Sequence, residues 1–168
     1  AMAVCNVQYV RIFEAISWHM EHGQHFPADY VKDLLGFCKT NGLKVFWSEW
    51  KTDNLPDVKT FTDIQSYIAG YEDIVTVSFG TNSHEAQPPD GFLYLQPMFK
   101  HWGASVQAWH ADTYLDCDPL DMPPYLLVQH ALSAKQIGAE IIQFEPYWYF
   151  FNNGQANENL TLLLTMLK

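Results

Sequence analysis

One pattern occurs five times along the chain and limits the folds open to it. A short apolar run is followed by a polar and aromatic stretch, and then by an amphipathic segment that closes on glycine or an acidic turn. The apolar runs predict buried strands and the longer periodic segments predict helices. The expected strands are Gln8–Phe13, Leu43–Ser48, Ile74–Phe79, Ser105–Trp109 and Glu140–Phe144. The helices expected to follow them are Pro27–Thr40, Asp57–Tyr71, Gly91–Trp102, Pro123–Ile137 and Asn157–Leu167.

Consecutive expected strands begin 31 to 35 residues apart. Strands that alternate with helices at this interval predict a parallel sheet with right-handed crossovers. The length of 168 residues favours an open doubly wound sheet, because a complete (β/α)₈ barrel takes about 250 residues. The lack of GxGxxG and GxxxxGK[ST] motifs favours the barrel, since an open nucleotide-binding sheet carries a glycine-rich phosphate turn. We expect an α/β fold of five consecutive βα units forming a partial, half-barrel type of sheet, with the doubly wound sheet as the alternative.

Glycines are expected to close three of the helices. Gly42, Gly103 and Gly138 each follow an expected helix end, where a left-handed residue caps the last turn at little steric cost. His101 and His130 fall inside expected helices, and their predicted role is structural.

Composition and charge narrow the function classes. With 9 Lys+Arg against 19 Asp+Glu, the formal net charge of −10 excludes nucleic-acid binding through a basic face. A hydrophobic content of 48% with 17% charged residues predicts one folded domain over residues 1–168. No apolar window approaches the roughly 18 residues of a spanning helix, so we expect a soluble chain and no membrane partner.

The sequence does not determine the cellular compartment of the protein. Ala1-Met2-Ala3 look like an addition ahead of the natural sequence, so a signal peptide could have been removed and secretion is one alternative. Three cysteines, Cys5, Cys38 and Cys117, lack CxxC spacing. They predict buried thiols and neither a disulfide framework nor a zinc knuckle.

Two glutamates at strand ends are the candidate catalytic residues. Glu49 and Glu145 follow the second and fifth expected strands, three strands apart, which in an eight-stranded barrel places them across the mouth from each other. Glycosidic bond hydrolysis uses such a pair: one carboxylic acid protonates the leaving oxygen, and the other carboxylate attacks the anomeric carbon or activates water. We predict Glu49 as the acid and Glu145 as the nucleophile or base. In the structural alternative Glu49 pairs with Lys51 or Lys44, and Glu145 caps the loop before a proline.

Aromatic side chains make up 15% of the chain, and many stand beside polar residues at the ends of apolar runs. Aromatic faces pack on the C–H surface of sugars while neighbouring polar groups bind hydroxyls, so the placement suits a carbohydrate ligand, and a large aromatic core is the alternative. The residues predicted to bind substrate are Glu14, Trp18, Trp50, His84, Trp109, His110, Asp112, Tyr147 and Trp148.

Two strand-end segments, Trp47-Ser48-Glu49-Trp50 and Gln143-Phe144-Glu145-Pro146-Tyr147-Trp148-Tyr149-Phe150-Phe151, carry a family resemblance. They resemble the catalytic (β/α)₈ barrel of glycoside hydrolases, most nearly the family 98 endo-β-galactosidase group. In retaining barrel glycosidases the acid follows the fourth strand and the nucleophile the seventh. The resemblance thus implies that this chain covers strands three to seven, with Glu49 as acid and Glu145 as nucleophile. Ser48 replaces the asparagine that usually precedes the acid, and an inverting relative would use a more distant base, Asp112 or Glu85.

Two other function classes stay open. The first is a non-catalytic carbohydrate-binding remnant, in which the aromatics bind sugar and the carboxylates are not poised for chemistry. The second is a metal-dependent hydrolase that uses His84, His110, Asp112 and Glu145 as ligands. The leading prediction requires neither a cofactor nor a metal.

The expected sheet also has consequences for assembly. Five βα units cannot close an eight-stranded barrel, and unpaired barrel edges are an aggregation liability. The chain is therefore expected to be a fragment of a longer barrel, to be completed by a second copy, or to form an open sheet. A homodimer is the natural prediction, with carbohydrate as the other partner.

Overall fold

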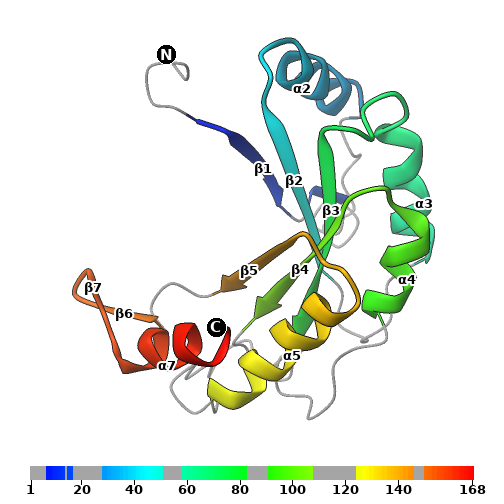
Figure 1. Ribbon diagram of the computed structural model, residues 1–168. Helices are drawn as coiled ribbons and strands as arrows, with labels where there is room; N and C mark the ends of the chain where they lie inside the picture. Colours follow the sequence, from blue (N-terminus) through cyan, green and yellow to red (C-terminus); the bar gives the residue numbers. More distant parts are fainter. Residues whose placement is uncertain are drawn as a thin grey trace.

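The computed structural model describes residues 7–13, 15–16, 28–50, 58–82, 91–107, 124–145 and 150–168. Five parallel strands form one sheet in the order β1-β2-β3-β4-β5 (Figure 1). The strands are β1 Tyr9–Phe13, β2 Lys44–Trp50, β3 Val75–Asn82, β4 Trp102–Gln107 and β5 Ile141–Glu145. A doubly wound sheet reverses its strand order at a switch point, so the sequential order confirms the half-barrel prediction and excludes the doubly wound alternative.

The helices between the strands lie along the outside of the curled sheet (Figure 1). They are α2 Ala28–Thr40, α3 Val58–Tyr67, α4 Gly91–Met98 and α5 Pro124–Gln136, and α7 Glu158–Met166 packs against α5 near the end of the chain. Right-handed crossovers between strands in sequential order place every connecting helix on the same face, which leaves the other face concave. The βα repeat thus builds half of a barrel wall.

The core lies between the sheet and these helices. On β2, Val45 and Trp47 are fully buried and belong to the same apolar cluster as Leu35 of α2 and Ile64 of α3. Because side chains alternate along a strand, Phe46 and Ser48 point to the opposite, concave face.

The expected boundaries of three elements are wrong: α3 ends at Tyr67 and not at Tyr71, α4 ends before Trp102, and β4 begins at Trp102 and not at Ser105. Gly103 does not end a helix but lies within β4, and α4 ends at Met98, so His101 stands in the bend before β4. Phe99 and Trp102 are both buried, and their apolar side chains carry the helical pattern past the true end of the helix. Gly42 and Gly138 have positive φ angles of 66° and 97°, which fits their predicted capping role.

Gly103 is required by close packing between neighbouring strands. A Cβ atom at this position would lie 2.6 Å from the carbonyl oxygen of Ile141 and 3.1 Å from the ring of Phe46. Gly103→Ala is therefore expected to lower the free energy of unfolding by about 2 kcal/mol, measured by chemical denaturation. The matched control is Gly36→Ala in α2, where the new Cβ meets only Tyr71 Oη at 3.6 Å and helix propensity improves. Equal stability of both variants would contradict the packing argument.

A short hairpin follows the last strand of the sheet and was not among the predicted elements. β6 Phe151–Asn152 pairs with β7 Gln155–Ala156 in antiparallel register. Asn153 and Gly154 connect them with φ angles of 49° and 79°, as a type I′ turn requires. Asn157 then caps α7, because its side-chain oxygen accepts a hydrogen bond from the Leu160 N–H at 3.2 Å.

Candidate active site

The carboxyl ends of the five strands lie at one edge of the sheet, because all five run in the same direction. At this edge Trp50 pairs with Gly80, Asn82 pairs with Gln107, and Gln107 pairs with Glu145. Asn82, Gln107 and Glu145 thus occupy adjacent positions across β3, β4 and β5. Asn82 and Gln107 were not singled out from the sequence, since their place in this row depends on strand register.

Glu49 is the best defined of the predicted catalytic residues. Its side chain is only 1% exposed, and its Oε1 atom accepts two hydrogen bonds. The indole Nε1 of Trp47 donates one at 2.7 Å, and the backbone N–H of Ile16, beyond the end of β1, donates the other at 3.0 Å. Two N–H donors on one oxygen hold the carboxylate in a defined orientation and connect β2 to the segment that follows β1.

The surroundings of Glu49 belong to the helix-facing side of the sheet. Trp47, two residues earlier on β2, is stacked on Tyr67 of α3 with ring centroids 6.4 Å apart. The expected alternative in which Lys44 neutralises Glu49 is wrong, because Lys44 stands at the opposite end of β2 and donates to the carbonyl oxygen of Asp73 at 2.7 Å. Lys51, the other expected partner, lies outside the described residues.

The second candidate, Glu145, is the last residue of β5. It is separated from β2 by two intervening strands, which amounts to about 14 Å along the sheet at the usual strand spacing. Pairing through β3 and β4 places Glu49 in register with Ile142, so Glu145 stands three residues further along the sheet than Glu49. Carboxyl groups in glycosidases lie about 5–5.5 Å apart in retaining and about 6.5–9.5 Å apart in inverting enzymes.

Most of the predicted substrate-binding residues fall outside the part of the chain that the structure describes. Trp50 is placed by its backbone as the last residue of β2. The remaining predicted residues are in undescribed segments and stay predictions: Glu14, Trp18, His84, Trp109, His110, Asp112, Tyr147 and Trp148, together with the alternative base Glu85.

Two buried serines on the concave face are a further feature that sequence reasoning missed. Ser78 of β3 and Ser105 of β4 have no exposed surface, and within the described structure no hydrogen-bond partner reaches either Oγ atom. Ser78 is in register with Ser48 and with Gly103, so small residues occupy this position on three neighbouring strands, and the buried Phe46 ring packs beside Gly103.

Other titratable side chains lie apart from the carboxyl edge. Cys38 is fully buried in α2 as predicted, and burial raises the pKa of its thiol. His130 is fully buried in α5. Over the described ranges no group of three or more His, Cys, Asp or Glu side chains is placed to hold a metal ion. Three ligands of the metal alternative, His84, His110 and Asp112, lie outside these ranges, so that alternative stays a prediction.

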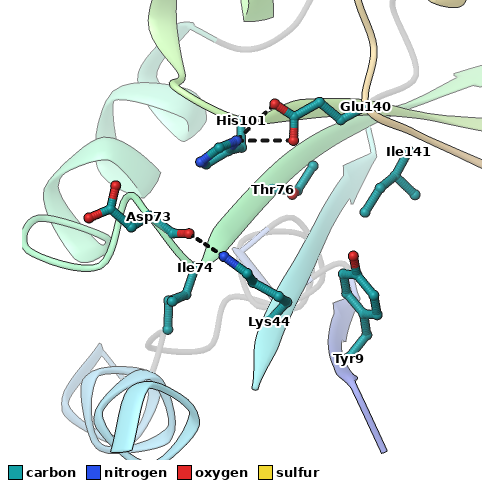
Figure 2. A pocket seen from close by; sticks show the side chains of 8 residues that line it. All are labelled: Tyr9, Lys44, Asp73, Ile74, Thr76, His101, Glu140 and Ile141. Atoms are coloured by element: carbon teal, nitrogen blue, oxygen red, sulfur yellow. Dashed lines mark hydrogen bonds and ion pairs between the residues drawn. The ribbon is translucent and has the colours of Figure 1, made fainter. Parts of the chain in front are cut away.

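At the opposite, amino-terminal edge of the sheet, a small pocket of about 160 Å³ opens on the concave side (Figure 2). Its lining includes Tyr9 of β1, Lys44 of β2 and Ile141 of β5. His101 Nδ1 lies 2.8 Å and 3.0 Å from the two carboxylate oxygens of Glu140, and both side chains border the pocket.

Asp73 at this edge forms an ion pair with Lys100, and the pKa of the Asp73 carboxyl is lowered chiefly by the hydrogen bond from Lys100. Because the folded pKa lies below the unfolded one, the pair stabilises the fold above the ordinary value of 3.8, and this contribution is lost as pH falls through the lowered pKa. Lys100→Met should return the pKa of Asp73 toward 3.8, as followed by NMR titration of its carboxyl carbon. An unchanged Asp73 titration would contradict this pairing.

Comparisons with known proteins connect the chain to one fold. No protein-family model and no curated protein matches the sequence. Solved structures do match, among them the catalytic module of a family 98 glycoside hydrolase from Streptococcus pneumoniae, both in its native form and with the H-disaccharide blood group antigen. The TM-score is 0.57 at 15% identity, over 86% of this chain and 29% of that one. A proposed α-L-fucosidase from Bacteroides thetaiotaomicron matches with a TM-score of 0.59 at 15% identity, over 94% and 53%.

These comparisons define the fold of the chain. At 15% identity, the chain has the half-barrel βα architecture found within glycoside hydrolase structures, and it spans about a third to a half of the length of those chains. None of the described helices is long and apolar enough to cross a membrane.

Proposed function

We propose that the chain is a glycoside hydrolase that cleaves a glycosidic bond with Glu49 and Glu145 as its two carboxylates. The observation that carries the proposal is the sheet itself. Five parallel strands in sequential order bring their carboxyl ends to one edge, and the two glutamates stand at or next to the last positions of β2 and β5. This edge is where ligands bind in barrel folds.

In the proposed mechanism Glu49 protonates the oxygen of the leaving sugar. Glu145 attacks the anomeric carbon or activates the water that does so. The hydrogen bonds from Trp47 and Ile16 hold Glu49 in place, which reduces the orientational freedom that a catalytic acid must lose. Trp18, Trp50, Trp109 and Trp148 are proposed as platforms for sugar rings.

The structural neighbours suggest which substrates to try. The family 98 catalytic module was solved with the H-disaccharide and with the Lewis Y pentasaccharide, both blood group antigens. We therefore propose oligosaccharides of this class, together with β-linked polysaccharides and galactose-rich glycans, as the first substrates to test.

One observation favours a second candidate, a carbohydrate-binding domain without turnover. Glu49 is only 1% exposed, and the neighbouring Trp47 on the same face packs against α3. Both features are consistent with a structural role of the Glu49 carboxylate. They are equally consistent with its role as an oriented catalytic acid.

A single screen separates the two candidates. The chain is incubated with the proposed glycans, and both released reducing ends and bound glycan are measured. Release of reducing ends supports the hydrolase, whereas saturable binding without release supports the binding domain. If the chain neither binds nor cleaves any of these glycans, both candidates are contradicted.

A further inference from the structure

The pocket at the amino-terminal edge of the sheet takes its central polar groups from inner strands. Lys44 begins β2, Thr76 is the second residue of β3, and His101 directly precedes β4. Phe46 lies two residues after Lys44 and pairs with Thr76, so Lys44 and Thr76 belong to the same, concave face of the sheet. These three strands have neighbours on both sides, so the central groups do not depend on what continues beyond β1 or β5.

Lys44 brings to this pocket a positive charge without a carboxylate partner. Its ammonium group donates to the backbone carbonyl oxygen of Asp73 at 2.7 Å, and no carboxylate of the described residues forms an ion pair with it. The Asp73 carboxylate is paired with Lys100, and Figure 2 shows it on the side away from Lys44. An ammonium group has three N–H donors, so Lys44 keeps donors for a ligand.

Thr76 adds a buried hydroxyl to the same pocket. The residue is only 7% exposed and lines the pocket, and within the described structure its Oγ1 atom has no hydrogen-bond partner. Buried hydroxyl groups are nearly always hydrogen-bonded, so an unpartnered one beside a pocket indicates a ligand there. Tyr9 offers a further donor, because Figure 2 shows its phenolic oxygen directed toward this group of side chains.

Glu140 is the remaining acidic side chain of the pocket lining. Both of its carboxylate oxygens lie within hydrogen-bond distance of His101 Nδ1, at 2.8 Å and 3.0 Å. Figure 2 shows this carboxylate turned toward the His101 ring. The two acidic side chains of the lining are thus engaged by partners of their own, while an ammonium group, a hydroxyl and a phenol are left as donors toward the pocket.

We infer that this pocket binds a phosphate group. Lysine is a common phosphate ligand, and its charge-assisted hydrogen bonds to phosphate oxygens are stronger than neutral ones. A tetrahedral oxyanion presents acceptor oxygens in several directions, which suits donors that come from β1, β2 and β3. The volume of about 160 Å³ has room for several water molecules or one small ligand. The pocket lies at the opposite edge of the sheet from the two glutamates, so this inference does not rest on the proposed hydrolase activity.

Titration of the whole chain with inorganic phosphate, followed by ¹H–¹⁵N NMR at constant ionic strength, tests the site. The amide signals around Lys44, Asp73 and Thr76 should shift in a saturable way. Lys44→Met should weaken binding at least about tenfold, because a hydrogen bond to a charged group is lost. Lys39→Met is the matched control and should bind phosphate like the parent chain. Lys39 Nζ also donates to a carbonyl oxygen, that of Gly70 at 2.8 Å, but it lies outside the pocket lining.

Two results would overturn the inference. One is the lack of any saturable shift at tens of millimolar phosphate. The other is a titration that is the same in Lys44→Met as in the parent chain.

Thr76 allows a second test that does not depend on charge. Thr76→Val removes the hydroxyl and should weaken phosphate binding about fivefold, whereas Thr76→Ser keeps the hydroxyl and should bind within about twofold of the parent chain. Because no described group is bonded to this hydroxyl, Thr76→Val should be as stable as the parent chain in chemical denaturation. Equal phosphate affinity of the two variants would contradict a role of Thr76 in the site.

Other anions define the ligand. Acetate, a planar anion with two oxygens, should bind more weakly than phosphate, and equal affinity for both would overturn the assignment to a phosphate group. Glycerol phosphate separates the two sources of that group. Tighter binding of glycerol phosphate than of inorganic phosphate supports a phosphorylated metabolite as the ligand, and tighter binding of inorganic phosphate supports the free ion.

Discussion

The variant Glu145→Gln is expected to hydrolyse its glycan about a thousandfold more slowly than the parent chain. Glutamine keeps the size and shape of the side chain but can neither attack the anomeric carbon nor accept a proton from water. The loss should therefore fall on kcat, while the affinity for the glycan changes little. Initial rates of reducing-end release across a range of glycan concentrations measure both quantities.

The same strand offers a matched control for this prediction. Glu140 directly precedes β5 at the amino-terminal edge, and Glu145 ends β5 at the carboxyl edge. Glu140→Gln makes an identical chemical change at the opposite end of the strand, where it affects only the contact with His101 and the amino-edge pocket. Its activity should match the parent chain. Equal activity in Glu140→Gln and Glu145→Gln would remove Glu145 from the mechanism.

The second large effect concerns Glu49 and stability. Glu49→Leu removes the acceptor of two hydrogen bonds. The indole N–H of Trp47 and the backbone N–H of Ile16 then lose this acceptor in a buried site. An unsatisfied buried donor costs about 1–3 kcal/mol, so the free energy of unfolding should fall by about 3 kcal/mol. Chemical denaturation followed by tryptophan fluorescence measures the change.

Glu49→Gln separates the structural role of this residue from its proposed catalytic role. The glutamine carbonyl oxygen can accept the same two hydrogen bonds, so stability should remain within about 1 kcal/mol of the parent chain. The amide cannot protonate a leaving oxygen, so turnover should be lost. A stable Glu49→Gln variant with full activity would leave Glu49 as a structural residue only.

The βα repeat explains how much of the fold the sequence could predict. The strand Lys44–Trp50 contains the buried apolar run Val45-Phe46-Trp47, and the helix Ala28–Thr40 buries one apolar side, so both periods are visible in the residues. The end of α4 could not be predicted, because the apolar pattern of the helix continues through Phe99 and Trp102. Both are buried, but Phe99 lies just beyond the helix end and Trp102 begins β4. The hairpin at Asn153-Gly154 carried a recognisable turn signal that the helical pattern after it obscured.

The candidate site was harder to predict, because it depends on register and side-chain direction. Placing Glu49 and Glu145 at strand ends needed only the repeat. The orientation of Glu49 depends on Trp47 and Ile16, the latter 33 positions away along the chain. The row of Asn82, Gln107 and Glu145 likewise follows from strand pairing. The pattern of apolar and polar residues along the chain specifies neither the hydrogen bonds of Glu49 nor the register of this row.

The most direct test of the hydrolase proposal is one reducing-sugar assay on the glycan panel with four proteins: the parent chain, Glu49→Gln, Glu145→Gln and Glu140→Gln. Circular dichroism of each confirms that it is folded. The proposal predicts release of reducing ends by the parent chain and by Glu140→Gln, and its loss in Glu49→Gln and Glu145→Gln. Undiminished release by folded Glu49→Gln and Glu145→Gln would contradict the two-carboxylate mechanism.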